Sequence, residues 1–195
     1  MKSLAVKLSL CALVLAVLPA NCFGKHHESP PDPRFLAIDQ IKIIPAVDLR
    51  AGKKDTVNLE KLDKMAEGVL KRKNYSAART DNKGITGDIA EEDLNDAKPE
   101  WIKRLGPADA RWVMVLGLND VHSKMSFGST GNAEVIGFLF DKQDGSVLWK
   151  GTGIGQAGQG GLLGMAMKGA MSEAAIETAV GNLLNDIPKL PKKGK

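Results

Sequence analysis

The pattern of hydrophobic and polar residues predicts a strand, a helix and a second strand in the first part of the chain. Residues 35–44 alternate and then run as consecutive aliphatic residues before Pro45, which is typical of a strand that enters a sheet interior. Apolar residues recur at steps of three and four over residues 58–73, so this segment is predicted to be an amphipathic helix. Residues 75–79 then predict a short strand. A unit of this kind joins parallel strands.

Turns and two short helices are predicted after the second strand. Asp88 and Glu91 have the spacing of a capping box, which favours a short acidic helix. Pro99 suits the first position of another short helix, which Gly106 would end. We therefore expect a turn-rich connection here.

The second half of the chain predicts three strands and a final helix. Residues 111–118 are almost continuously hydrophobic and give the strongest signal of a buried strand. Residues 134–140 and 146–149 flank an Asp-Gly turn, so they predict a β-hairpin. The polar, Gly-containing residues 123–132 predict a loop. Residues 165–186 carry a broad apolar face at helical spacing and predict the final helix.

The order of these elements defines the expected fold. It is β-α-β-α-β-β-β-α, an α/β single domain with a mixed sheet of about five strands and a C-terminal helix packed on it. We assign residues 35–187 to this domain, residues 23–34 to a Pro-rich tether, and residues 188–195 to a basic disordered tail. The tail is either a frayed, solvated end or a means of associating with an anionic surface.

The first 22 residues have the pattern of an export signal. Lys2 and Lys7 precede eleven uncharged residues, 8–18, and small and polar residues follow. This run is shorter than the ~20 apolar residues that span a bilayer, and it matches a secretory signal peptide. We therefore expect residues 1–22 to be removed and the mature protein to be exported.

Two processing routes stay open at the end of this signal. A bacterial lipoprotein signal ends with a Cys that is acylated and becomes the first residue, and Cys22 stands at that place. The residues before it depart from the usual pattern at Asn21 and Pro19, so cleavage nearby by ordinary signal peptidase is the alternative. Cys11 leaves with the signal, so neither route allows an internal disulfide.

Composition narrows the range of functions. The 195 residues include 27 Lys and Arg against 23 Asp and Glu, and the net charge of +4 is too small to predict a nucleic-acid partner. Three His and two Cys leave little material for metal or thiol chemistry. No Gly-x-Ser-x-Gly elbow is present, and His122 is the one His beyond the tether. We expect a protein that is not an enzyme, with no catalytic residue, cofactor or metal.

One catalytic alternative stays open, an envelope hydrolase that uses carboxylates at strand ends. Two carboxylates that meet at a sheet edge could divide general acid and general base work between them. The sequence alone does not bring the available positions together. These positions are Asp39, Asp48, Asp120 and Asp141.

A Gly-rich, uncharged segment, residues 151–167, precedes the final helix. It contains Gly153-x-Gly155-x-x-Gly158, the letters of a dinucleotide-binding fingerprint, but no second parallel strand follows, so we expect no nucleotide. Either the glycines make a flexible connection that lets the last helix fold back on the sheet, or the segment is an exposed apolar surface that contacts a partner. We favour the connection. The partner-contact candidates of the second interpretation are Leu162, Leu163, Met165 and Met167.

Three motifs and the entry into the last helix carry a resemblance. The motifs are Ile41-Lys-Ile-Ile-Pro-Ala-Val47, Ala108-Asp-Ala-Arg-Trp-Val-Met-Val115 and Asp141-Lys-Gln-Asp-Gly-Ser-Val-Leu-Trp-Lys-Gly151, and the helix entry is a Gly-Gly-Leu-Leu-Gly run that ends at Gly164. The motifs are similar to the opening strand, an Ala-Asp-Ala strand and a hairpin of TolB amino-terminal-like and curli-secretion-like lipoprotein domains. The helix entry narrows the resemblance to an uncharacterised family of bacterial lipoproteins.

The resemblance implies a function in the cell envelope without catalysis. Such a protein acts through contacts with a protein partner in envelope assembly or secretion, and it supplies no catalytic residue to compare. The implied location is the periplasm, with anchoring to the outer membrane where Cys22 carries lipid.

Overall fold

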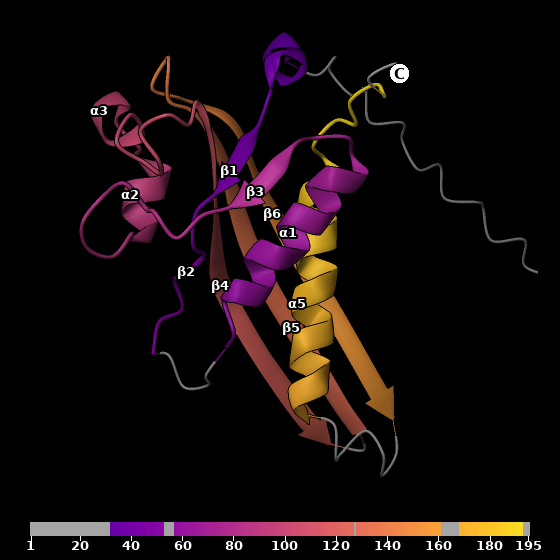
Figure 1. Cartoon of the computed structure of the whole chain (residues 1–195). Helices are drawn as coiled ribbons and strands as arrows, with labels where there is room; N and C mark the ends of the chain where they lie inside the picture. Colours follow the sequence, from indigo (N-terminus) through magenta and orange to yellow (C-terminus); the bar gives the residue numbers. More distant parts are fainter. Residues whose placement is uncertain (1–31, 53–56, 127, 161–167, 193–195) are drawn as a thin grey trace, which may run out of the picture. The chain divides into compact units, whose positions relative to one another are not determined.

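A six-stranded mixed sheet carries the fold (Figure 1). The computed structural model describes residues 32–52, 57–126, 128–160 and 168–192. The strand order is β3-β1-β4-β5-β6, and β2 pairs with β4 beyond the end of β1. β1 is parallel to β3 and β4, whereas β4, β5 and β6 are antiparallel. The strands are β1 (Ile41–Ile43), β2 (Val47–Asp48), β3 (Ala77–Arg79), β4 (Trp112–Ser126), β5 (Gly128–Asp141) and β6 (Ser146–Gly160).

Helices cover the two faces of this sheet unequally. α1 and α5 pack on one face, and the short α2 and α3 cover part of the other (Figure 1). The predicted α/β class, the mixed sheet and the packing of the C-terminal helix are therefore confirmed. In the described part of the chain, no helix has the length and hydrophobicity needed to cross a membrane. The helices are η1 (Pro33–Ala37), α1 (Glu60–Arg72), α2 (Glu91–Asn95), α3 (Pro99–Ile102) and α5 (Lys168–Asn185).

The first half of β4 is the centre of the core. Trp112, Met114 and Leu116 face α1 and α5, while Val113 and Val115 face α2 and α3, and all five are fully buried. A strand covered on both faces has no solvent side on which to place polar residues. This explains why residues 111–118 gave the clearest strand signal in the sequence.

β1 and β2 form one path along β4 that is interrupted at Pro45. The backbone N–H of Ala46, next to the interruption, donates to Oδ2 of Asp63 in α1 at 3.2 Å. The Asp63 side chain is buried, and its Oδ1 has no hydrogen-bond partner among the described residues. Burial raises the pKa of this carboxyl to about 7. Asp63 therefore ties the first helix to the interrupted strand at an electrostatic cost.

The chain enters the fold earlier than predicted and in a different conformation. Residues Pro33–Ala37 form the 3-10 helix η1, in which Pro33 occupies the first turn and Asp32 accepts a hydrogen bond from the Arg34 N–H at 2.9 Å. Arg34 also donates to Ser146 Oγ at 3.1 Å, which ties η1 to the start of β6. The predictions of a strand from residue 35 and of a tether reaching residue 34 are therefore wrong, because a local cap competes with extension.

The tail predicted to be disordered is instead fixed where it begins. Its backbone makes hydrogen bonds to residues at the end of α1 and just after it. The Tyr75 hydroxyl donates to Pro188 O at 2.8 Å, the Leu190 N–H donates to Lys73 O at 3.0 Å, and Asn74 Nδ2 donates to Leu190 O. Leu190 also packs against the main core. The prediction is wrong for these residues, and the last three residues of the tail lie outside the described part.

β4, β5 and β6 are each 14 or 15 residues long, well beyond the predicted strands. The loop predicted at residues 123–132 is the end of β4 and the start of β5. The first ten residues of the Gly-rich segment belong to β6, so the prediction of a flexible connection is wrong for them. The dinucleotide-like glycines lie within an antiparallel strand, whereas a phosphate-binding loop joins a strand to a helix.

The glycines of β6 allow α5 to lie directly on the strand. A Cβ atom at Gly153 would be 2.0 Å from Ala179 O, and one at Gly155 would be 1.9 Å from Ala175 O. Both contacts are with helix backbone, which cannot rotate away. These glycines therefore serve close packing rather than flexibility.

Candidate functional site

The long strands β4, β5 and β6 extend beyond α2 and α3, and we call this far half of the strands the distal half. A helix covers only one of its two faces. α5 lies on that face, whereas α2 and α3 cover the other face only near the opposite end of the strands (Figure 1). Lys150 Nζ donates to Asn95 Oδ1 of α2 at 2.7 Å, near the border between the covered and uncovered halves. We call the uncovered half the open face. Its side chains come from Asp120, His122, Lys124, Thr130, Asn132, Glu134, Thr152, Ile154 and Gln156.

The strand register arranges the open face in rows. Asp120, Glu134 and Ile154 lie opposite one another across the three strands, and His122, Asn132 and Gln156 form the next row. The face is polar apart from Ile154, whose residue surface is 61% exposed. A large aliphatic side chain exposed on a polar sheet offers a partner a point of contact.

The carboxylates of the catalytic alternative have separate hydrogen-bonding partners. Asp141 is fully buried and accepts from Arg111 at 2.9 Å, and Asp48 accepts from Arg50 at 2.8 Å. Asp141 lies opposite Trp112 at the start of β4. Asp120 lies eight residues further along β4, about 26 Å away at 3.3 Å per residue. The structure therefore does not bring Asp141 and Asp120 together, and Asp39 lies before β1, where it accepts from the Gln40 N–H.

His122 has one carboxylate neighbour and lies at the surface. Its Nδ1 is 2.8 Å from Asp120 Oδ2, and the two side chains are 47% and 54% exposed. Within the residues that the structure describes, no three His, Cys, Asp or Glu side chains gather as a metal site requires. The pair is a solvated hydrogen-bonded contact on the open face.

The outer edge of β6 borders the open face. β6 is the last strand in the sheet order, and among the described strands only β5 pairs with it. Asn182 Nδ2 of α5 donates to Ile154 O at 2.8 Å, so the Ile154 carbonyl points away from β5. Backbone groups alternate in direction along an antiparallel strand. Those of Thr152, Gln156 and Gly158 therefore point to the same free edge.

This edge lacks the features that usually protect an unpaired strand. Natural edges are short, or they carry Lys, Pro or inward-pointing charge. Residues 151–160 contain no charged residue and no Pro over ten positions. Such an edge can accept an extended segment as an added strand, with backbone hydrogen bonds for affinity and side-chain contacts for specificity.

The predicted site residues fall largely outside the part that the structure describes. Cys22 lies there, and so do the partner-contact candidates Leu162, Leu163, Met165 and Met167, which follow β6 directly in the sequence. The sequence analysis missed the edge itself. The signal was present as a period of two, because Gly or Ala alternates with Thr, Ile and Gln over residues 151–157.

Comparisons with known proteins found resemblance in structure alone. No family model matches the chain, and no curated protein matches its sequence. Solved structures do resemble it, among them a lipoprotein, GNA1162, from Neisseria meningitidis, with 16% identity over 69% of this chain and 96% of that chain, at a TM-score of 0.47. The PelC dodecamer from Paraburkholderia phytofirmans has 13% identity over 79% of this chain and 90% of that chain, with a TM-score of 0.47.

A third example is a minor lipoprotein from Acinetobacter baumannii, with 10% identity over 80% of this chain and 98% of that chain, at a TM-score of 0.39. Similarity at this level does not carry function from one protein to another. The chain is similar to these solved structures, and its sequence matches no family model.

Proposed function

We propose that this protein is exported to the cell envelope and acts there without catalysis, by binding an extended segment of a protein partner along the free edge of β6. The proposal depends on the outer edge of β6. No described strand pairs with this edge, and residues 151–160 contain no charged residue. The signal-like residues 1–22 support export. Asp48, Asp120 and Asp141 each have a partner of their own, Arg50, His122 and Arg111, which supports a role without catalysis.

Side chains beside the edge would give the interaction its specificity. Thr152, Ile154 and Gln156 project from β6 onto the open face, where they are exposed. A partner strand added to β6 would place alternate side chains next to them. Asn182 donates a hydrogen bond to the Ile154 carbonyl. On binding, this hydrogen bond would either be replaced by one from the added strand or remain beside it.

Charging the edge tests this proposal. We expect the Thr152→Lys/Ile154→Lys variant to recover at least about tenfold less partner protein from solubilised envelopes, because charge on an edge opposes strand addition. Quantitative mass spectrometry of the co-purified proteins measures the effect. Glu177→Lys, an exposed change on α5, is the control and should recover the partner fully. Equal recovery by the edge variant would contradict the proposal, provided that its thermal unfolding matches the wild type.

The mass of the mature chain tests export. We expect protein isolated from envelopes to lack the signal, since residues 1–22 match a cleavable export sequence. Intact-mass spectrometry then distinguishes the two processing routes, because an acylated chain beginning at Cys22 is heavier than an unmodified chain cleaved nearby. If the protein isolated from its native cells retained Met1, this result would contradict export.

A further inference from the structure

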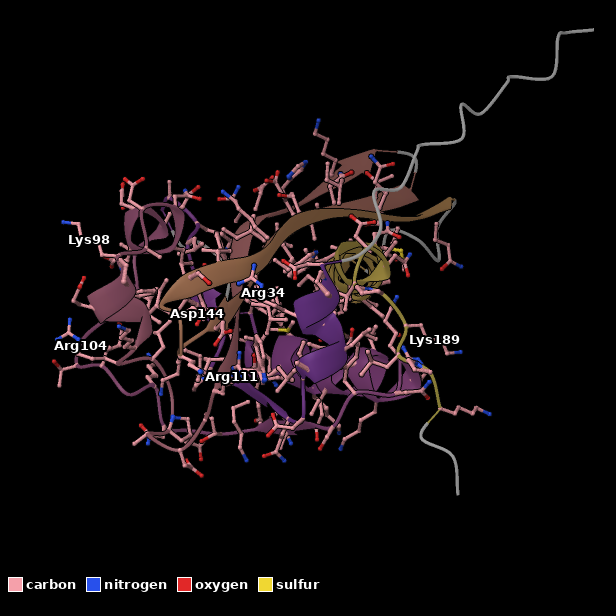
Figure 2. The ribbon with its side chains drawn as sticks, turned by 90° about the horizontal axis from the view of Figure 1, so that it is seen from above. Arg34, Lys98, Arg104, Arg111, Asp144 and Lys189 are labelled. Atoms are coloured by element: carbon pink, nitrogen blue, oxygen red, sulfur yellow. The ribbon has the colours of Figure 1, made fainter. Side chains whose placement is uncertain are left out.

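Basic side chains lie at the end of the described unit that is farthest from the distal half of the long strands. This upper pole consists of η1, α3, the turn between β5 and β6, and the residues that follow α5 (Figure 1). Figure 2 looks down on it and shows Lys98 and Arg104 on one side, Arg34, Arg111 and Asp144 nearer the middle, and Lys189 on the other side. Lys98, Arg104 and Lys189 are exposed and form no ion pair with any described residue.

One ion pair at this pole, Arg111–Asp141, presents its positive member to solvent. In the Arg111–Asp141 pair the carboxylate side chain is 0% exposed, whereas the guanidinium side chain is 39% exposed. Arg34 has both Asp32 and Asp144 as neighbours, at 2.8 and 4.0 Å, so its charge is largely balanced. The outward positive charge therefore comes mainly from Lys98, Lys103 and Arg104, which flank α3 and its exposed Glu100, and from Arg111 and Lys189.

Two further lysines donate their hydrogen bonds to backbone carbonyls rather than to carboxylates. Lys73 Nζ donates to Asn185 O and Ile187 O at 3.0 and 2.7 Å, and Lys142 Nζ donates to Pro107 O at 2.7 Å. These acceptors are backbone carbonyls, which orient the ammonium groups but do not cancel their charge. Both lysines therefore add positive charge to the pole, which Asp186 near Lys73 and Asp109 near Lys142 partly offset.

The same pole exposes apolar surface. Leu36 in η1 is 71% exposed, the most of any large hydrophobic residue that the structure describes, and Val147 at the start of β6 is 39% exposed. A water-exposed leucine within a set of Lys and Arg side chains matches how proteins bind the interface of an anionic membrane, with apolar groups entering the headgroup region and basic groups near the phosphates.

The position of Cys22 in the sequence also favours a membrane at this pole. This point rests on the proposed export. Asp32 lies at this pole, ten residues after Cys22. Ten residues reach at most about 35 Å when extended. The strands run away from the pole for the 15 residues of β6, or about 45 Å at 3.2–3.4 Å per residue. A membrane at the pole would therefore leave the free edge of β6 accessible.

We infer that the upper pole binds an anionic lipid surface, with Leu36 entering the headgroup region and Lys98, Arg104, Arg111 and Lys189 facing the lipid phosphates. This contact orients the protein on the membrane, so that the distal end of the sheet projects toward its partner. It requires no acyl chain, so it can be measured on the mature chain itself.

Vesicle binding tests the inference. Unacylated residues 23–195, which contain the whole described unit, are mixed with vesicles of phosphatidylglycerol and phosphatidylethanolamine, or with neutral phosphatidylcholine vesicles, and sedimented. We expect at least about tenfold tighter binding to the anionic vesicles, weakened by salt. Lys98→Glu/Arg104→Glu should weaken this binding about tenfold or more, and Leu36→Asn should weaken it at high salt as well.

Lys64→Glu/Lys124→Glu is the matched control, because it makes the same change in net charge at exposed positions on α1 and distal β4. It should keep most of the binding. Equal binding to neutral vesicles, or an equal loss in both double variants, would overturn the inference. Either result would leave the β6 proposal standing, because the capture of a partner from solubilised envelopes involves no vesicle.

Discussion

Replacing Gly155 with Ala is expected to lower the free energy of unfolding by about 3 kcal/mol, at the upper end of what overpacking costs. The new Cβ would lie 1.9 Å from Ala175 O and 2.4 Å from Ala179 N, so either α5 or β6 must move. A larger residue such as valine at the same position should prevent α5 from docking. Urea denaturation monitored by circular dichroism measures both effects.

Gly181→Ala supplies the control within the same helix. No atom lies within 4 Å of a Cβ built at Gly181, and alanine favours a helix over glycine by about 1 kcal/mol. This variant should be slightly more stable than the wild type. If Gly155→Ala were equally stable, β6 would not pack against α5 as described.

The second large effect concerns Asp63, whose replacement by Asn is expected to stabilise the protein at pH 8. Burial raises the pKa of this carboxyl to about 7 in the folded state, against about 3.9 in an unfolded chain. The folded state therefore binds the proton on Asp63 more tightly, so the contribution of this group to stability is greatest below about pH 4 and falls as the pH rises to 7. Three pKa units at 1.36 kcal/mol each set an upper limit of about 4 kcal/mol for this loss.

Unfolding free energies at pH 4.5, 6 and 8 measure this dependence. The amide of the Asp63→Asn variant keeps an acceptor oxygen for the Ala46 N–H but cannot ionise, so the variant should gain relative to the wild type as the pH rises. Asp88→Asn, at an exposed carboxyl, is the matched control. A difference between Asp63→Asn and the wild type that stays constant across the three pH values would contradict the account.

The elements that were predicted well from the sequence are those in which the hydrophobic positions coincide with the buried ones. The first half of β4 is covered on both faces, and its residues are hydrophobic throughout. α1 shows its apolar face at steps of three and four, and Leu62, Ala66 and Leu70 are fully buried. In the β5–β6 turn, Gly145 has a φ of +65°, the conformation that favours glycine.

The distal halves of β4, β5 and β6 were not predicted as strands, because neither of their faces needs large hydrophobic residues. The open face carries polar side chains, and the opposite face carries small ones, such as Gly153 and Gly155, because α5 approaches closely. Without hydrophobic residues, a period of two also fits a loop or a flexible connection. The candidate site lies in this region, so predicting it required the position of α5.

Two other features depend on contacts between segments far apart in the sequence. The chain after α5 is fixed by Lys73, Asn74 and Tyr75, more than 110 residues earlier. Asp63 lies buried beside Ala46 only because β1 is interrupted at Pro45. No local pattern identifies either contact. The export signal, in contrast, is a local pattern, and its interpretation stays a prediction.

Photo-crosslinking in living cells tests most directly the claim that the edge of β6 binds a partner in the envelope. A photoreactive residue is placed at Thr152, Ile154 or Gln156 of the full-length chain, and at Lys64 or Glu177 as controls on helix surfaces. We expect one shared cross-linked envelope protein at the three edge positions and little cross-linking at the controls. Cross-links as abundant at the controls, or none at the edge, would contradict the claim.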